Sequence, residues 1–527
     1  MRTKNSIKNI TFVLIDTIAV TILSFIARKI FLNELSTYHL GLKGLFNNLL
    51  SMLSLAELGI GTAIAYNLYK PISENNVEKI KTVMDYYRRA YFKIALFIFT
   101  LGIVLSFFLE KIINEAQNGA GYLQIVFIIF LLNTCFTYIF AYKRTLIIAD
   151  QKAYKLVPFT TLFKLLTIVA QCIIIITTQN FILYLIVALG TNLLENCVVN
   201  ASILKRYPFL KEKPLRRMPK NERRIIGNNI KDMFFHKFGD YAINGTDNII
   251  ISMFINVSTV GLYSNYGLII QSVQAFISKA FSSLTASFGN LIAEEGVEKR
   301  YEIFRQFNFI AFWVFGCVSV CMYNSINEFI YIWLGSEYLI DKLTVGIVLF
   351  NFYLVGLRIP VNIIKISAGV FRQDRLIPII QAVVNLGITL LLVKAWGLKG
   401  VFAGTLVSSI AVPCWYRPIV VYKYVFKKNT AQYFTSYLLY LGVMVISVMV
   451  TTSANNTYFA QNTLAHFIYR VLFSFLITNC IIIAVFYKTK EFKGVFILLY
   501  NQLSKADKPK NRKNDIGDVN EKECNLV

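Results

Sequence analysis

Charged residues are scarce in this chain of 527 residues, at 16% of the total. Soluble globular proteins carry about 25%, whereas hydrophobic residues here reach 56% and the mean hydropathy is +0.55. The composition excludes an ordinary soluble domain. It also excludes a disordered chain and a nucleic-acid-binding module of ordinary composition, because both are far more polar. An integral membrane protein is therefore predicted.

Catalytic and metal-binding motifs are also missing. The chain has no GxxxxGK[ST] loop, no HExxH and no GxSxG, and its three histidines are scattered. Seven of the eight cysteines lie in apolar runs without metal-ligand spacing, which predicts no disulfide, no metal site and no cofactor. Without a nucleotide-binding loop an ATP-driven pump is disfavoured. We expect a protein that is not an enzyme.

Long apolar runs are what the chain has in abundance. A membrane-spanning helix needs about 20 such residues, and fourteen stretches qualify, which predicts an all-α membrane protein. They are Ile10–Phe31, Leu42–Tyr66, Tyr91–Leu109, Tyr122–Tyr142, Leu156–Ile176, Phe181–Leu204, Ile230–Phe254, Gly261–Ala286, Phe309–Trp333, Val345–Ile366, Leu376–Val393, Val401–Tyr422, Tyr433–Val450 and Phe467–Phe486.

The net charge of +25 follows the topology of these helices. Of the 54 Lys and Arg residues, 43 fall in alternate connections. The positive-inside rule then places both termini in the cytoplasm and makes anionic membrane lipids, not nucleic acid, the expected partner of the surplus charge. The few cations assigned to the outer side are Lys29, Lys43, Lys111, Lys342, Lys394 and Lys399.

A basic cytoplasmic link over residues 205–229 divides the first twelve helices into an N-terminal lobe (1–204) and a C-terminal lobe (230–428). Helices thirteen and fourteen (429–487) and a basic cytoplasmic tail (488–527) follow. The pairs Ser36-Thr37 and Gly41-Leu42 open the second helix, and Ser258-Thr259 and Gly261-Leu262 open the eighth. This echo favours two related halves in the same orientation.

Charges within the apolar runs mark candidate functional positions, because such groups usually face a bundle interior or a water-filled cavity. The seventh stretch carries His236, Asp240, Asn244 and Asp247 at spacings that place them on one helix face. This pattern predicts the lining of a cavity. A hydrogen-bonded seam between helices is the alternative interpretation.

Other charges in the runs have similar alternatives. Glu57 lies between small residues in mid-span, where it lines a cavity or forms an internal ion pair. Arg358, two residues before Pro360, can bind phosphate bidentately or hold a buried acid. Arg28 lies close to an outer helix end and Lys279 close to a cytoplasmic one, so either can extend to the interface.

Three segments resemble bacterial polysaccharide-unit flippases of the Wzx type, in the multidrug/oligosaccharidyl-lipid/polysaccharide (MOP) exporter superfamily. They are the run ARKIFLNELSTYHLGLKGLFNNLLSMLSLAELGIGTAIAYNLYKPI (27–72), YKRTLIIADQKAY (142–154) and TDNIIISMFINVSTVGLYSNY (246–266). The fourteen helices also match that family.

This resemblance implies two six-helix lobes that enclose a central cavity and move between inward- and outward-open states, with two further helices at the end. It implies a typically cationic cavity and a cargo of undecaprenyl-pyrophosphate-linked oligosaccharide. Arg28 corresponds to a basic position late in the family's first helix. In this chain Glu57, Glu195 and Asp247 offset the basic groups, which leaves room for proton or sodium coupling.

We therefore expect a multi-pass flippase of the bacterial plasma membrane that serves capsule, exopolysaccharide or O-unit synthesis. The expected cargo-binding residues are Arg28, Lys164, Lys279 and Arg358, and those expected for ion coupling or gating are Glu57, Asp240 and Asp247. Expected partners are the cargo, membrane lipids, a polysaccharide polymerase and other assembly proteins.

Three alternatives remain open. The first is a cation-coupled multidrug exporter of the same superfamily. The second is an outer-face polysaccharide polymerase or ligase, which the short outer loops disfavour. The third is a scaffold that recruits assembly enzymes through the basic link.

Overall fold

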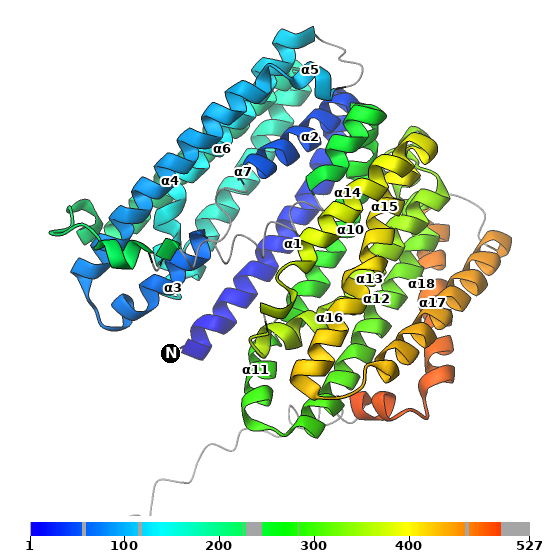
Figure 1. Cartoon of the computed structure of the whole chain (residues 1–527). Helices are drawn as coiled ribbons and strands as arrows, with labels where there is room; N and C mark the ends of the chain where they lie inside the picture. The colour runs from blue at the N-terminus through cyan, green and yellow to red at the C-terminus, as the bar shows by residue number, and fades with distance from the viewer. Residues whose placement is uncertain are drawn as a thin grey trace, which may run out of the picture.

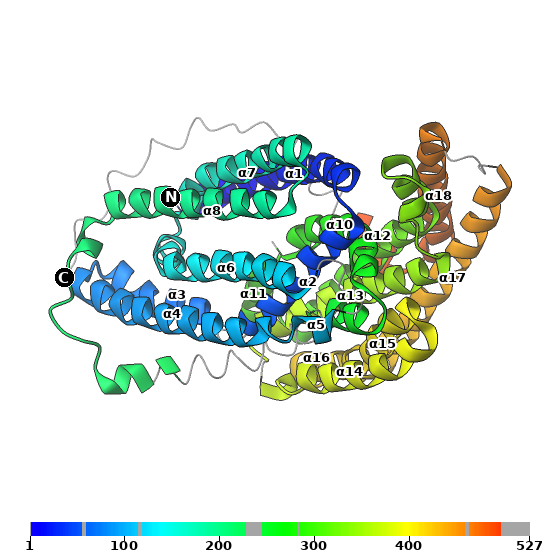
Figure 2. The same ribbon diagram turned by 90° about the horizontal axis from the view of Figure 1, so that it is seen from above.

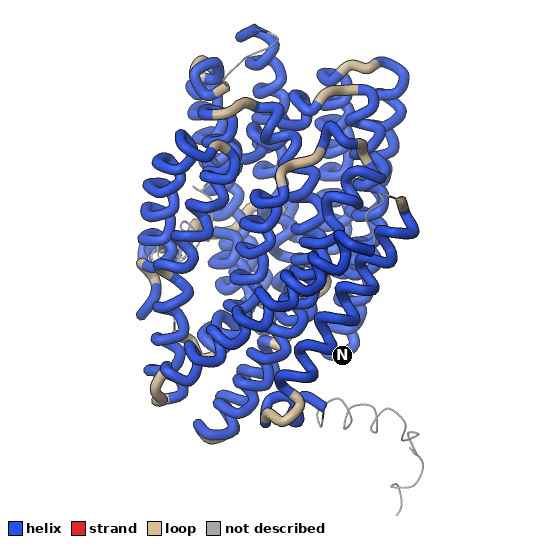
Figure 3. Tube along the Cα trace, turned by 90° about the vertical axis from the view of Figure 1, so that its right-hand side faces the viewer, coloured by secondary structure: helices blue, strands red, loops and turns tan. Residues whose placement is uncertain are grey.

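The computed structural model describes residues 2–54, 60–113, 119–224, 226–227, 245–282, 284–370, 372–458 and 463–496. Every regular element in these ranges is helical (Figures 1 and 3). Ten helices there are long and apolar enough to cross a membrane. The predicted all-α class is confirmed for this part of the chain.

The N-terminal lobe comprises the helices before the basic link. They are α1 (Arg2–Glu34), α2 (Thr37–Leu53), α3 (Ile60–Ser73), α4 (Val77–Ser106), the short α5 (Leu109–Ile112), α6 (Gly119–Ala149), α7 (Val157–Thr178) and α8 (Phe181–Arg206). Helix α1 packs on α7, α7 on α8, α8 on α6 and α6 on α4. The short turn η2 (Ala153–Lys155) lies between α6 and α7, and η3 (Pro208–Lys211) follows α8.

The C-terminal lobe follows from residue 245. Its helices are α10 (Val257–Ser282), α11 (Thr285–Glu294), α12 (Val297–Trp333), α13 (Lys342–Ser367), α14 (Ile377–Trp396), α15 (Leu398–Ala411) and α16 (Pro413–Val421). The turns η4 (Ser336–Tyr338) and η5 (Arg372–Asp374) flank α13, and η6 (Tyr422–Phe426) ends α16. Of the predicted seventh helix only residues 245–254 are described, so the lobe boundary at residue 230 stays a prediction.

Local sequence accounts for several helix starts. Proline occupies the first turn of both α7 and α14, where its missing N–H costs nothing and its fixed φ suits a helix. The side chains of Asn180 and Asp341 accept hydrogen bonds from the first backbone N–H groups of α8 and α13. These caps stabilise the first turns of α8 and α13.

The two lobes meet where α2 crosses α10, at the end of the bundle away from the N-terminus (Figures 1 and 2). A Cβ atom on Gly41 would lie 1.9 Å from the carbonyl oxygen of Val257, and one on Gly261 would lie 2.1 Å from that of Thr37. The contact is symmetric, because Val257 lies four residues before Gly261 and Thr37 lies four residues before Gly41. The repeated Gly-Leu pairs noted in the sequence thus lie at this crossing, which we call the glycine seam (Gly41 and Gly261). Any side chain at either position would separate the helices.

The last two helices, α17 (Ala431–Tyr458) and α18 (Leu464–Phe486), pack on α12 at the side away from the N-terminal lobe (Figure 2). Polar groups join them: Asn324 donates to Thr451 Oγ1 at 2.9 Å, and Asn455 donates to Ser474 Oγ at 3.0 Å. Arg470 of α18 also forms an ion pair with Glu328 of α12, and these side chains are 8% and 17% exposed. Buried polar pairs thus set the register of the additional helices.

Replacing Arg470 by Met should leave the Glu328 carboxylate buried without this cation. Breaking one half of a buried pair costs about 3–5 kcal/mol, so the purified variant should unfold at a clearly lower temperature in detergent. The double variant Arg470→Met/Glu328→Gln should recover most of the loss. Equal melting temperatures for the single and double variants would show that the pair does not hold α18.

Candidate functional site

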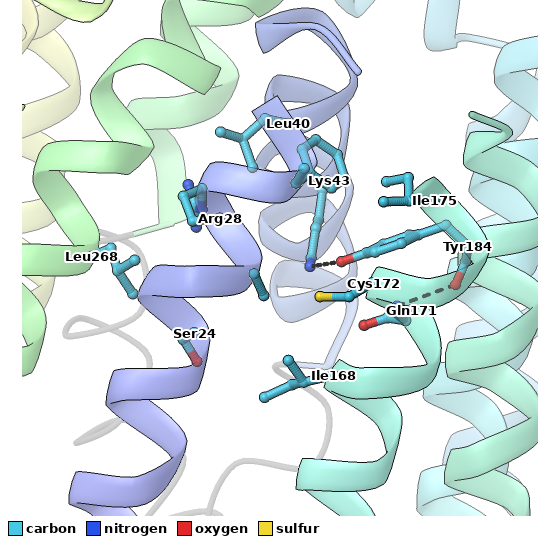
Figure 4. A pocket seen from close by; sticks show the side chains of 12 residues that line it. Ser24, Arg28, Leu40, Lys43, Ile168, Gln171, Cys172, Ile175, Tyr184 and Leu268 are labelled. Atoms are coloured by element: carbon cyan, nitrogen blue, oxygen red, sulfur yellow. Dashed lines mark hydrogen bonds between the residues drawn. The ribbon is translucent and has the colours of Figure 1, made fainter. Parts of the chain in front are cut away.

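A cavity of about 170 Å³ lies on the side of the N-terminal lobe that faces α10, and Leu268 is its lining residue from the C-terminal lobe. Its lining residue Leu40 precedes Gly41 of the glycine seam. Helices α1, α2, α7, α8 and α10 contribute to its wall (Figure 4). The polar and reactive side chains that line it are Ser24, Arg28, Lys43, Gln171, Cys172 and Tyr184. No acidic residue is among the described residues that line this central cavity.

Arg28 connects the two lobes across the central cavity. From α1 its Nη1 donates to Ser264 Oγ at 2.8 Å and to Asn265 Oδ1 at 3.1 Å, and both acceptors belong to α10. Both acceptors are neutral, and no salt bridge to Arg28 is formed within the described ranges. Arg28 thus lines this cavity, and its expected role in cargo binding stays a prediction.

Lys43 is the second cation of the cavity. Its Nζ donates to Tyr184 Oη at 2.8 Å and lies 5.2 Å from the centre of the tyrosine ring (Figure 4). Gln171 donates to the backbone oxygen of Tyr184 at 3.1 Å, which positions that ring. The partners of Lys43 seen here are neutral too, so the cavity carries two positive charges and suits an anionic group.

The sequence analysis counted Lys43 among the cations of the outer side, although it is the second residue of the predicted run Leu42–Tyr66. In the structure α2 begins at Thr37, so Lys43 lies about 9 Å along the helix. The signal that could have found it is Ser36, a residue type typical of the position before a helix. The sequence analysis also did not identify Ser264 and Asn265, which accept hydrogen bonds from Arg28. Uncharged polar residues in an apolar run give no distinct sequence signal.

Two predicted cargo residues lie nearer the N-terminal end of α1, outside the central cavity. Lys164 is exposed and lies one turn before Ile168, a cavity-lining residue of α7. Lys279, also exposed, donates to Thr17 Oγ1 at 2.6 Å and so links α10 to α1. Since Thr17 precedes Arg28 by eleven residues, this contact lies about 16 Å from it along α1.

The structure does not bring Arg358 to the central cavity. Its side chain is buried inside the C-terminal lobe, with Nη1 at 3.6 Å from Cys414 Sγ. Glu195 is likewise engaged, since Arg144 donates to its Oε1 at 2.9 Å. It therefore does not offset the cavity's charge, contrary to the mixed cavity expected from the sequence. Glu57 and Asp240, together with His236 and Asn244, lie outside the described residues.

Asp247 belongs to a separate cluster of oxygen atoms in the C-terminal lobe. It lies beside Thr405, whose Oγ1 accepts from Asn385 Nδ2 at 3.0 Å. Among the buried oxygens that lack a hydrogen-bond partner in the part of the chain that the structure describes are Asp247 Oδ1, Asn385 Oδ1 and Thr389 Oγ1. Such oxygens are costly unless satisfied, so this oxygen cluster could hold a proton or a small hard cation.

Solved structures of membrane transporters share this architecture. A structure of the lipid II flippase MurJ in an inward closed conformation aligns with a TM-score of 0.70 at 13% identity, over 91% of this chain and 99% of that chain. An inward-facing multidrug resistance MATE transporter of the MOP superfamily aligns with a TM-score of 0.61 at 16% identity, over 79% and 99%. A point mutant of the MATE transporter VcmN of Vibrio cholerae gives 0.56 at 13%, over 81% and 98%.

No protein-family model matches the chain, and no curated protein is significantly similar to it. Together with the ten apolar helices, the structural likeness shows a multi-pass membrane protein with the fold of MOP transporters. The predicted all-α multi-pass membrane fold is thereby confirmed, whereas the number of fourteen helices and the cytoplasmic position of both termini stay predictions. At these identities the likeness concerns the fold.

The glycine seam should control access to the central cavity from the outer side. Gly41→Ala should hold α2 and α10 apart, because the added Cβ meets the Val257 carbonyl. Cys172 lines the cavity, so it reports on access when the other cysteines are replaced by serine. An impermeant thiol reagent outside the cell should label Cys172 several-fold faster in Gly41→Ala.

Gly190→Ala in α8 is the matched control, since nothing lies within 4 Å of its Cβ position. Cys172 in this variant should be labelled at the same rate as in the protein with both seam glycines intact. Identical labelling of all three proteins would show that the α2–α10 crossing does not close the cavity.

Proposed function

We propose that this protein flips a lipid-linked oligosaccharide, carried on undecaprenyl pyrophosphate, from the inner to the outer leaflet of the bacterial plasma membrane. The export would serve capsule, exopolysaccharide or O-unit synthesis. The observation that carries the proposal is the pair Arg28 and Lys43, which face one cavity between the lobes with neutral partners. A polysaccharide polymerase and other assembly proteins stay predicted partners.

The chemistry of the cargo explains why two cations are needed. A pyrophosphate cannot enter hydrocarbon unaided, because an isolated buried charge costs many kcal/mol. Arg28 can bind a phosphate with two parallel N–H donors, and Lys43 adds a compact positive charge. The sugars would occupy the water-filled space between the lobes while the isoprenoid chain stays in lipid.

Cargo binding can also be coupled to movement of the lobes. The N–H donors that Arg28 now offers to Ser264 and Asn265 are those that a phosphate would take. A bound phosphate would therefore remove one of the links between α1 and α10. The cargo would favour lobe separation by binding the separated state more tightly. Lys279 on Thr17 is a second α10–α1 link, nearer the side from which cargo enters.

Arg28→Ala and Lys43→Ala should each lower surface polysaccharide at least tenfold in cells that lack the chromosomal copy, and the double variant should abolish it. Lipid-linked oligosaccharide should accumulate in the membrane while protein levels stay constant. Lys29→Ala is the matched control, because Lys29 is the exposed neighbour on α1. Normal polysaccharide in the double variant, or a change in drug resistance alone, would favour the multidrug exporter instead.

Asp247 is our proposed residue for ion coupling. A cation that binds the folded protein raises its melting temperature, so Na⁺ should stabilise the purified protein and leave Asp247→Asn unchanged. If the ion is a proton, the variant should instead lose part of the protein's pH-dependent stability. Glu110→Gln, an exposed acid in α5, should behave like the unmodified protein. If Asp247→Asn shows the same stabilisation by Na⁺ and the same pH dependence as the unmodified protein, Asp247 does not couple an ion to transport.

A further inference from the structure

A second hollow lies on the N-terminal lobe, between α4 and α6. Its volume is about 510 Å³, and it is lined by Arg88, Arg89, Phe92, Lys93, Ile139 and Lys143, among others. Helix α4 forms an edge of the lobe in both Figure 1 and Figure 2. The α4–α6 groove shares no lining residue with the central cavity.

The groove opens away from the interior of the lobe. Tyr87 and Tyr91 of α4 are buried, and Tyr91 stacks on Tyr138 of α6. The neighbouring positions on α4 therefore face the opposite way, and Phe92 is 59% exposed. Ile139 of α6 is exposed beside it. Large exposed apolar side chains on a membrane-spanning pair of helices contact lipid chains.

The same groove carries four cations. Asp85 is the acid nearby, and it forms ion pairs with both Arg88 and Arg89, so one carboxylate serves two guanidinium groups. Lys143 donates to the neutral Asn200 at 2.5 Å. No acid is among the described residues that line the groove. A surplus of positive charge therefore lies against an apolar wall.

The basic link adds to this charge. A smaller hollow of about 230 Å³ adjoins the groove, shares Arg89 and Lys93 with it, and is completed by Arg217 and Arg223 of the link. The link is held to α4 by Glu222, which pairs with Lys79 at 2.5 Å. Asp85 also lines this smaller hollow, so a rim in which the cations outnumber this acid runs from α6 across α4 to the link.

We propose that the α4–α6 groove is a binding site for an anionic phospholipid of the cytoplasmic leaflet. The phosphate lies among Arg88, Lys93 and Lys143, and one acyl chain lies along Phe92 and Ile139. Charge complementarity and the apolar wall both fit this occupant, since basic pockets between helices on the cytoplasmic side bind phospholipid head groups. By neutralising the rim, the lipid would also hold the basic link on the N-terminal lobe.

The test measures binding of phosphatidylglycerol to the purified full-length protein by native mass spectrometry, with phosphatidylcholine as the neutral lipid. The triple variant Arg88→Gln/Lys93→Gln/Lys143→Gln should bind phosphatidylglycerol at least tenfold more weakly. The matched control is Lys488→Gln/Lys490→Gln/Lys493→Gln, which removes three cations after α18. Its affinity should stay within twofold of the unmodified protein.

Equal losses in the two triple variants would overturn the proposal, because they would indicate only diffuse attraction to positive charge. Displacement of phosphatidylglycerol by a lower concentration of undecaprenyl phosphate would also overturn it and make the groove a cargo site. The single variant Lys93→Gln controls for misfolding of the triple variant, because Lys93 is exposed. This variant should bind phosphatidylglycerol several-fold more weakly and keep the melting temperature of the unmodified protein. None of these outcomes depends on the proposed transport activity.

Discussion

The cost of an unpaired charge away from water organises this helix bundle. Inside the lobes, cations and acids occur in pairs: Arg470 with Glu328, Arg144 with Glu195, and Lys365 with Asp374. Arg28 and Lys43 differ, since the described residues around them offer hydroxyl and amide groups only. A protein can retain such cations where water or an anionic ligand reaches them. Inside the C-terminal lobe Arg358 is an exception, because its contact is Cys414 and it forms no salt bridge within the described residues. Neutral partners together with a place on the cavity wall therefore distinguish Arg28 and Lys43.

The glycine seam explains how that cavity can be shared between two lobes. Gly41 and Gly261 let the backbones of α2 and α10 approach closely, and Val257 of α10 packs into the hydrophobic core of the N-terminal lobe. Small residues at a crossing of this kind allow close van der Waals packing between membrane helices. Arg28 lies beside the seam and adds polar links that a ligand can replace. The contact between the lobes therefore combines a tightly packed glycine crossing with polar links that a ligand can replace.

The sequence predicted the helical membrane fold, because runs of apolar residues are a local pattern. A lone cation within such a run is a local pattern too, and it led to Arg28, whose role as a cargo residue stays a prediction. The sequence failed for Arg358 because hydropathy gives the depth of a residue but not the direction in which it points. The partner of Arg358, Cys414, lies 56 residues further along the chain. The sequence analysis also did not identify Asn385, Thr389 and Thr405, because they are uncharged and lie far from Asp247 along the chain. Only tertiary packing brings these uncharged residues to Asp247.

The spatial separation of the charged sites bears on the class of cargo. An exporter of organic cations needs acids where its substrate binds, whereas Asp247 belongs to a cluster away from the residues lining the central cavity. The cavity itself offers cations, hydroxyl groups and the ring of Tyr184, which suit phosphates and sugars. In the proposed function, this separation lets Asp247 bind an ion without neutralising the cations of the cavity. A phosphorylated cargo fits that arrangement better than a cationic one, which is why we propose it.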